Sequence, residues 1–170
     1  MSILIIAGSA RQDSVNRKLQ HRIAEVAEQM GIAYRLYEPS ELDAPLYHGD
    51  LEQEKGVPAS MQRFAEAVAG ASKVVVISPE YNASVPPLLK NAIDWSSRVD
   101  GSVWAGKTVL LGAASPGALG GMRGLSHLRD ILTNVLAWIA PLMASCKNAN
   151  DETIAAMDDD YLQKFLQQGD

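Results

Sequence analysis

The chain has 170 residues, of which 47% are hydrophobic and 21% are charged, and its formal net charge is −5. This size and composition are typical of a soluble globular protein, so we expect residues 1–170 to form a single domain. The acidic balance argues against nucleic-acid binding, which relies on Lys and Arg facing phosphates. Cys146 is the only cysteine, which excludes an internal disulfide and a cysteine metal cluster.

The N-terminal sequence MSILIIAGSARQ has no basic leader, and its apolar run is too short for the core of a signal peptide. Nothing in the sequence approaches the ~20 apolar residues that span a bilayer. We therefore expect a cytoplasmic protein that makes no membrane contact.

Apolar runs alternate with amphipathic runs along the chain, which is the pattern of βαβ units around a parallel sheet. The apolar runs predict strands at residues 3–7, 33–37, 73–78, 107–114 and 138–142. Helical periodicity predicts helices around residues 19–30, 61–68, 88–93, 125–136 and 161–166. This order predicts an α/β fold: a flavodoxin-like three-layer α/β/α sandwich with a five-stranded parallel sheet in the order 2-1-3-4-5.

Residues 38–60 form the one long stretch without a predicted element, with three prolines and a mostly acidic balance. Loops of this length are uncommon in compact domains unless they have a use. The stretch is either a surface excursion or a segment at a ligand rim or a subunit contact.

The loop after the first predicted strand, GSARQDSVN, leads directly into a helix. Gly8 permits a tight exit from the strand, and Ser9, Ser14 and Asn16 place short polar side chains at the helix start. The free N–H groups of a helix start attract anions, and Arg11 offers a forked cation to phosphate oxygens. Because GxGxxG and GxxxxGK[ST] are both absent, the loop predicts a site for a single phosphate. The alternative is a capped helix with a solvated arginine.

The loop after the third predicted strand has the sequence PEYNASVPP. In the order 2-1-3-4-5 the sheet reverses between its first and third strands, and ligands bind at that point. Tyr81 offers an aromatic face and a hydroxyl, while Asn82 and the neighbouring N–H groups suit the polar edge of a heterocycle. The prolines fix the backbone, and Pro87 suits the first turn of the next helix.

The loop after the fourth predicted strand, SPGALGGMRG, contains four glycines. They allow a close backbone approach to a flat ligand, or simply a turn. Ser115 and Gly117 become candidate ligand contacts only because the other two loops point to the same pocket.

The sequence lacks the residue patterns of several catalytic classes. The three histidines have no metal spacing, and GxSxG is absent. We expect His21 and His127 at solvated helix positions, the three tryptophans in the core or a subunit contact, and Met122 in packing. With no evident nucleophile, metal or acid–base pair, a cofactor is expected to carry the chemistry.

The three loops together resemble the NADPH-dependent FMN reductase family, which includes flavin-dependent quinone, azo and chromate reductases. The first loop matches GSxRxxSxN, residues 78–95 match SPEYNxSxPxxLKNAIDW, and residues 115–129 match SPGxxGGxRxxxHLR. The similarity covers about residues 1–145.

This resemblance implies an FMN site with no catalytic side chain and no metal, since the flavin N5 carries the reaction. Ser9, Arg11, Ser14 and Asn16 would hold the FMN phosphate beside Val15. Pro79, Glu80, Tyr81 and Asn82 would line the isoalloxazine and ribityl chain, with Ser115 and Gly117 on the far side.

The resemblance also implies a ping-pong reaction. NADPH or NADH would reduce the flavin, and a quinone, azo compound, metal oxyanion or free flavin would then oxidise it. Family members are usually homodimers or homotetramers. The rival interpretation is a flavodoxin-like electron carrier, or an FMN-binding module without turnover. We favour the enzyme because carriers usually lack an arginine like Arg11 in the first loop.

Overall fold

The computed structural model describes residues 2–167. A parallel sheet lies at its centre in the order β2-β1-β3-β4-β5, with β6 also paired to β4. The strands are β1 (Ile3–Ala7), β2 (Tyr34–Tyr37), β3 (Lys73–Ile77), β4 (Thr108–Ala114), β5 (Trp138–Ile139) and β6 (Ala144–Cys146). The helices are α1 (Val15–Gln29), η1 (Pro39–Leu42), α2 (Gly49–Lys55), α3 (Ala59–Gly70), α4 (Pro87–Val99), α5 (Met122–Asn134), α6 (Asp151–Ala155) and α7 (Asp160–Gln167).

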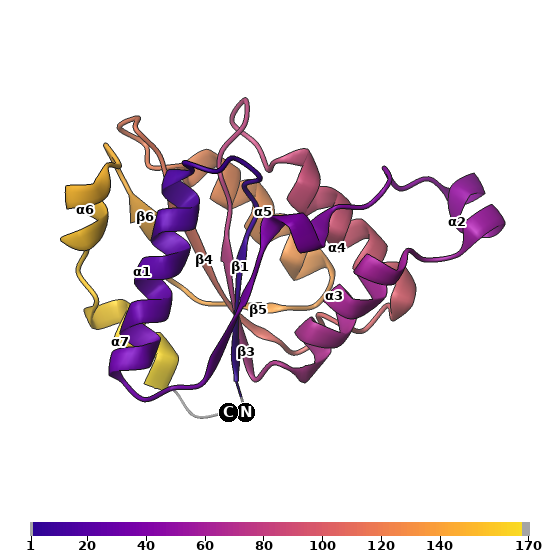
Figure 1. Ribbon diagram of the computed structural model, residues 1–170, viewed down its shortest axis with the longest axis horizontal. Coiled ribbons are helices and arrows are strands. Elements are labelled where there is room, and N and C mark those ends of the chain that lie inside the picture. Colours follow the sequence, from indigo (N-terminus) through magenta and orange to yellow (C-terminus); the bar gives the residue numbers. More distant parts are fainter. Residues whose placement is uncertain (1, 168–170) are drawn as a thin grey trace.

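Helices cover both faces of the sheet, which gives the three layers that the sequence predicts (Figure 1). On one face Leu4 and Ile6 of β1 belong to a core with α3, α4 and α5. On the other face Ile3 and Ile5 pack with α1, α6 and α7. Alternate residues of one strand thus point into two cores. Burial of each large apolar side chain contributes about 1.5–3 kcal/mol, so both faces stabilise the sheet.

The fifth strand position differs from the prediction of one strand over residues 138–142. β5 ends at Ile139, and β6 begins five residues later at Ala144. β5 pairs with the start of β4, and β6 pairs with its end, so two short strands share one edge position. Pro141 lies between them and has no N–H group to donate to the ladder, which accounts for the interruption.

The stretch over residues 38–60 is less irregular than predicted, because it contains η1 and α2. α2 projects away from the rest of the molecule (Figure 1) and has no buried residue. Its sequence GDLEQEK has a single large apolar residue, Leu51, and therefore lacks the periodicity by which a helix is predicted.

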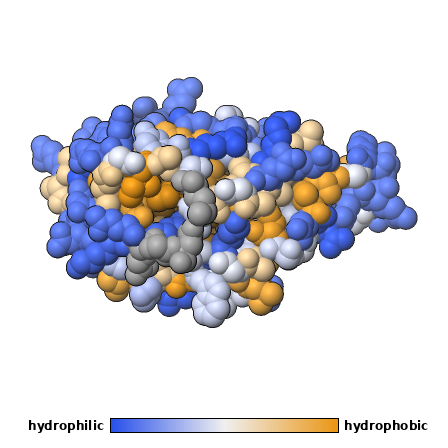
Figure 2. Space-filling model, turned by 90° about the horizontal axis from the view of Figure 1, so that it is seen from below, coloured by the Kyte–Doolittle hydropathy of each residue, from blue (hydrophilic) through white to orange (hydrophobic). Residues whose placement is uncertain are grey.

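The last turn of α7 lies at the amino end of the strands, where the Lys73 ammonium of β3 donates to the carbonyls of Phe165 and Leu166 (Figure 1). Seen from that side, hydrophobic residues form separate patches on a largely hydrophilic surface (Figure 2). Among the described residues, no helix combines the length and apolar character needed to cross a bilayer.

Candidate functional site

Three loops gather at the carboxyl end of the sheet, where β1, β3 and β4 end (Figure 1). This is the point at which the strand order reverses, as the sequence predicts for a ligand site. The loops surround a cavity of about 220 Å³, which is lined by Ser9, Arg11, Ser14, Val15, Asn16, Pro79, Glu80, Tyr81, Ala114, Ser115 and Pro116. Asn82 and Gly117 are the only predicted site residues outside this lining. Ala114 and Pro116 are additions that have no chemical signature in the sequence.

The first loop leaves β1 in close contact with its neighbours. The Gly8 N–H donates to the carbonyl of Ile77 at 2.8 Å, which fixes the loop to the end of β3. A Cβ at Gly8 would lie 3.1 Å from Cβ of Leu89, so the packing of α4 requires the glycine there. Gly8 does not have a positive φ, so the tight exit from the strand predicted from the sequence does not depend on the backbone freedom of glycine.

The end of the first loop offers hydrogen-bond donors to a ligand. Ser14 caps α1, and its hydroxyl accepts from the Asn16 N–H at 3.2 Å. Among the described residues, no hydrogen bond uses the backbone N–H groups of residues 9–14 as donors. Ser9 and Ser14 are buried beside these groups. Free N–H groups just before the start of a fifteen-residue helix favour an anion there.

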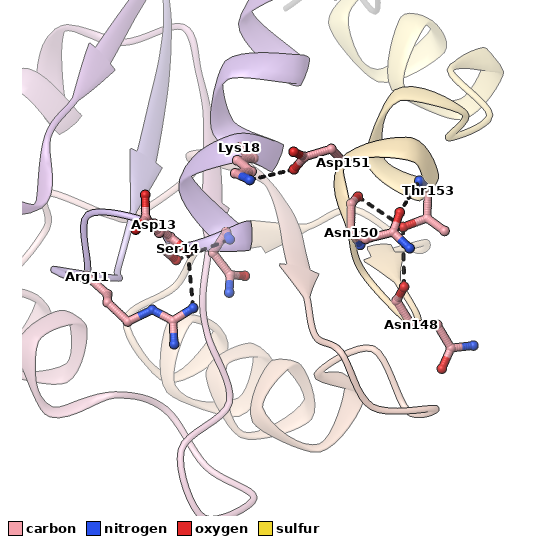
Figure 3. Close-up of polar contacts among 9 residues, drawn as sticks. Arg11, Asp13, Ser14, Lys18, Asn148, Asn150, Asp151 and Thr153 are labelled. Atoms are coloured by element: carbon pink, nitrogen blue, oxygen red, sulfur yellow. Dashed lines mark hydrogen bonds and ion pairs between the residues drawn. The ribbon is translucent and has the colours of Figure 1, made fainter.

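Arg11 is the one cation among the residues that line the cavity. Its guanidinium is exposed, and its Nη2 donates only to the carbonyl oxygen of Asp13, at 3.1 Å (Figure 3). An exposed side chain that is held by one bond to its own loop is free to turn toward an anion. The phosphate contact of Arg11 stays a prediction.

Asn16 has a different environment. Its Nδ2 donates to the carbonyl of Ala114 at 2.9 Å, and the Ala114 N–H donates to its Oδ1 at 2.8 Å. The side chain is 3% exposed and binds the backbone at the end of β4 as a neighbouring strand would. Asn16 thus ties the start of α1, where the first loop ends, to the end of β4, where the third loop begins.

The second loop is a tight hairpin. Tyr81 and Ser84 exchange two backbone hydrogen bonds of 3.0 Å, and Asn82 and Ala83 between them have φ values of 49° and 62°. Two successive positive φ angles are the signature of a type I′ turn, in which Ala carries a steric cost. Tyr81 is 48% exposed, so its ring stands at the mouth of the cavity. Pro87 is the first residue of α4, as predicted.

Glu80 binds the start of α5. One carboxylate oxygen accepts from the N–H groups of Arg123 and Gly124, both at 3.0 Å, and the other accepts from the Arg123 guanidinium. Burial opposes ionisation of this carboxyl, but the hydrogen bonds from Gly124 and Arg123 outweigh it and lower its pKa. Glu80 is therefore a carboxylate near neutral pH.

The third loop rests on the end of β6 and on the chain that follows it. The Ser115 N–H donates to the carbonyl of Cys146. In return, the Ala149 and Asn148 N–H groups donate to the carbonyls of Ser115 and Gly117. Gly120 and Gly121 have φ values of 57° and 82°. A Cβ at Gly121 would lie 2.6 Å from Cβ of Ala113. These two glycines thus serve contacts within the protein, which fits the turn that was one of the two interpretations of this loop.

The C-terminal segment lies beside the first loop. Lys18 of α1 pairs with Asp151 at the start of α6, and Asn150 caps α6 by accepting from the Thr153 N–H (Figure 3). This segment follows the part of the chain that carries the family motifs. Its contacts support α1 rather than line the cavity.

Part of the long second motif has a use outside the cavity. The Asn91 side chain accepts from the Tyr47 N–H and donates to the carbonyls of Ala44 and Pro45. The Trp95 indole also donates to Pro45, at 2.7 Å. These residues attach the 44–47 segment to α4.

The remaining predicted positions agree with the structure in most cases. His21 and His127 are exposed on helices, and Trp95 and Trp104 are buried in the core. Trp138 is 72% exposed, and Met122 is also exposed and not a packed core residue.

A larger cavity lies elsewhere, between α5 and β5, with a volume of about 720 Å³. Its lining is mostly apolar, and Arg129 and Thr133 are its only polar side chains. We place the functional site in the smaller cavity, because buried hydroxyls, free N–H groups and a cation converge there.

Comparisons with known proteins point to one family. The family model described as NADPH-dependent FMN reductase matches residues 1–151. A quinone reductase of Escherichia coli (strain K12) is 42% identical over 132 residues, which cover 78% of this chain and 69% of that protein. A 2-hydroxy-1,4-benzoquinone reductase of Burkholderia sp is 33% identical over 174 aligned positions, which cover 98% of this chain and 92% of that protein.

A solved structure is also similar. FerB, a flavoenzyme NAD(P)H:(acceptor) oxidoreductase from Paracoccus denitrificans, superposes with a TM-score of 0.77 and 28% identity. The superposition covers 97% of this chain and 92% of that chain.

Proposed function

The chain belongs to the NADPH-dependent FMN reductase family, and on this premise we propose that it passes electrons from NADPH or NADH to a quinone or another small acceptor. FMN held by Ser9, Arg11 and Ser14 would supply hydride-transfer chemistry through its N5, and the nicotinamide and the acceptor would react in turn, in ping-pong order. The residues of the chain bind and orient the cofactor and leave one side of the site open to two reactants in turn.

The observation that carries this proposal is the convergence of three loops on one cavity at the switch point of the sheet. A phosphate monoester needs several donors and positive charge. The free N–H groups of residues 9–14, the hydroxyls of Ser9 and Ser14, and Arg11 supply them. We assign the phosphate to these groups together with the backbone of Val15. Asn16 supports the loop through Ala114.

The other two walls suit a flat ring. We assign the hairpin from Pro79 to Asn82 to one side of the isoalloxazine, and Ser115 and Gly117 to the other. Asn82 and Gly117 lie outside the cavity lining, so we assign to them only contacts with the part of the cofactor that extends beyond the cavity. The cavity is smaller than the roughly 300–1,000 Å³ of pockets that enclose a whole ligand, which supports a cofactor left partly open.

We propose a quinone as the first acceptor to test, because two of the relatives are named as quinone reductases. Azo compounds, metal oxyanions and free flavin are the alternatives within the same reaction. We also propose that residues 1–170 act as one FMN-binding domain in a homodimer or homotetramer. Light scattering after size-exclusion chromatography measures the oligomeric state.

The test is anaerobic reduction of the purified, FMN-loaded protein. We expect NADPH or NADH to bleach the flavin absorbance rapidly and a quinone to restore it. An electron carrier would bind FMN and be reduced only slowly by either nicotinamide. A protein that takes up no FMN would overturn the proposal, and Arg11→Ala with wild-type FMN affinity would overturn the phosphate assignment.

A further inference from the structure

The Glu80 carboxylate lies between two walls of the cavity. Glu80 begins the hairpin after β3, while its partners Arg123 and Gly124 belong to the first turn of α5. The Arg123 guanidinium donates from Nε at 3.0 Å and from Nη2 at 2.7 Å to the same oxygen. The Glu80 side chain is 11% exposed, whereas that of Arg123 is 60% exposed. The third loop runs directly into this turn through Gly121.

The backbones of the hairpin and α5 also approach closely at this place. A Cβ at Gly124 would lie 3.2 Å from the carbonyl oxygen of Ser84 and 3.3 Å from Cβ and Cγ of Glu80. The Ser84 hydroxyl and Nδ1 of His127 are hydrogen-bonded at 3.0 Å. The hairpin is therefore docked on α5 by a carboxylate, a hydroxyl and direct packing.

The hairpin requires such support. Asn82 and Ala83 have positive φ angles, and strained residues of this kind persist only where their surroundings hold them. Arg123 does not line the cavity, and among the residues that the structure describes its guanidinium contacts only the Glu80 carboxylate. An effect of Arg123 on ligand binding must then pass through Glu80.

We propose that Glu80 and Arg123 are positioning residues that hold the second and third walls of the FMN site as one unit. The proposal rests on the FMN site proposed above. It assigns the Glu80 carboxylate to α5 and not to the flavin. Arg123, which lies outside the lining, then supports FMN affinity through the hairpin.

A double-mutant cycle tests this assignment. FMN is titrated into apoprotein, and the dissociation constant is read from quenching of flavin fluorescence. We expect Arg123→Ala and Glu80→Ala each to weaken binding about tenfold, an ordinary coupling within one ion-pair network. Arg123→Ala should have no further effect when Glu80 is already Ala. Arg123→Lys keeps the positive charge but loses the two-pronged guanidinium, so its FMN dissociation constant should lie between those of the wild type and Arg123→Ala.

The structure offers a matched control in the Arg98–Glu52 pair, a second Arg–Glu pair with Nε to carboxylate distances of 2.9 and 3.0 Å. Glu52→Ala should leave FMN affinity unchanged. Hydrogen exchange of the amides of residues 81–84 in apoprotein gives a readout that needs no ligand. We expect faster exchange in Arg123→Ala and Glu80→Ala, and no change in Glu52→Ala.

Three outcomes would overturn the proposal. Single variants with wild-type FMN affinity and hairpin exchange would show that the pair positions nothing. An Arg123→Ala effect of equal size in both backgrounds would place Arg123 directly on the ligand. An equal loss in Glu52→Ala would indicate general destabilisation. If Glu80→Ala does not fold, Glu80→Gln replaces it, since Gln keeps an acceptor for the α5 N–H groups. Absence of FMN binding by the wild-type protein would refute the proposed function, while hydrogen exchange would still test the docking of the hairpin.

Discussion

Replacing Asn16 by Ala separates two roles that the sequence leaves combined. The family resemblance places Asn16 at the FMN phosphate, whereas the structure shows its amide bound on both sides to the Ala114 backbone, at 2.8 and 2.9 Å. Both residues are buried, at 3% exposure. The variant would leave the N–H and the carbonyl of Ala114 without their protein partner at the buried wall of the cavity.

The size of the effect follows from these two orphaned groups. Each buried group without a hydrogen bond costs about 1–3 kcal/mol, so we expect the free energy of unfolding to fall by about 2–4 kcal/mol. For a chain of this length that corresponds to a decrease in Tm of roughly 5–15 °C. Urea unfolding of the apoprotein, followed by circular dichroism, measures the change without any contribution from FMN.

Arg11→Ala serves as the comparison, because we expect it to lower FMN affinity and leave the free energy of unfolding almost unchanged. Arg11 is exposed and bonds only the carbonyl of Asp13, so its removal should change the free energy of unfolding by less than about 0.5 kcal/mol. Loss of a charge-assisted bond should weaken FMN binding roughly 10–100-fold. An Asn16→Ala apoprotein as stable as the wild type, with weakened FMN binding, would refute the structural role of Asn16.

Three further predictions concern stability. Gly121→Ala should lower the free energy of unfolding by about 2 kcal/mol or more, because the new Cβ meets the neighbouring strand at 2.6 Å with φ at 82°. Gly70→Ala, whose Cβ meets nothing within 4 Å, should raise it by about 0.5–1 kcal/mol, and thermal unfolding compares the two. Ala83→Gly relieves a φ of 62° and should raise Tm slightly; a lower Tm would show that the turn is not strained. The pKa of Glu80 is lowered on folding from its ordinary value of 4.5, so its contribution to stability is present above that pH and is lost as the pH falls through the folded value. Glu80→Gln should remove this part of the acid dependence, and equal pH profiles of unfolding would contradict the ion pair.

The local patterns of the sequence were sufficient for the central strands of the sheet and the loops that follow them. Continuous apolar runs identify β1, β3 and β4, because strands that are covered on both faces have no polar side. Short polar residues identify the first loop, because the Ser14 hydroxyl caps the helix by accepting from an N–H group only two residues away. In both cases the physical cause lies inside one short stretch of chain.

Elements whose cause lies outside the local pattern were missed. α2 has a single large apolar residue, Leu51, so no periodicity marks it. The edge strand was predicted as one element because its apolar residues continue past Pro141, while its pairing changes from the start of β4 to the end. Ala114 and Pro116 line the cavity only by their position, which no residue type signals.

The sequence by itself determined the order of the central elements and predicted the edge of the sheet at which a ligand would bind, and its family resemblance predicted the class of cofactor. Only the tertiary structure decided which polar groups face that ligand. Asn16 binds a backbone 98 positions away, and Glu80 binds a helix 43 positions away. Such pairs form when distant segments pack together, and a hydrogen bond made within the protein removes that group from the ligand. Sequence spacing records local burial and turn geometry, but it carries no information on these partners.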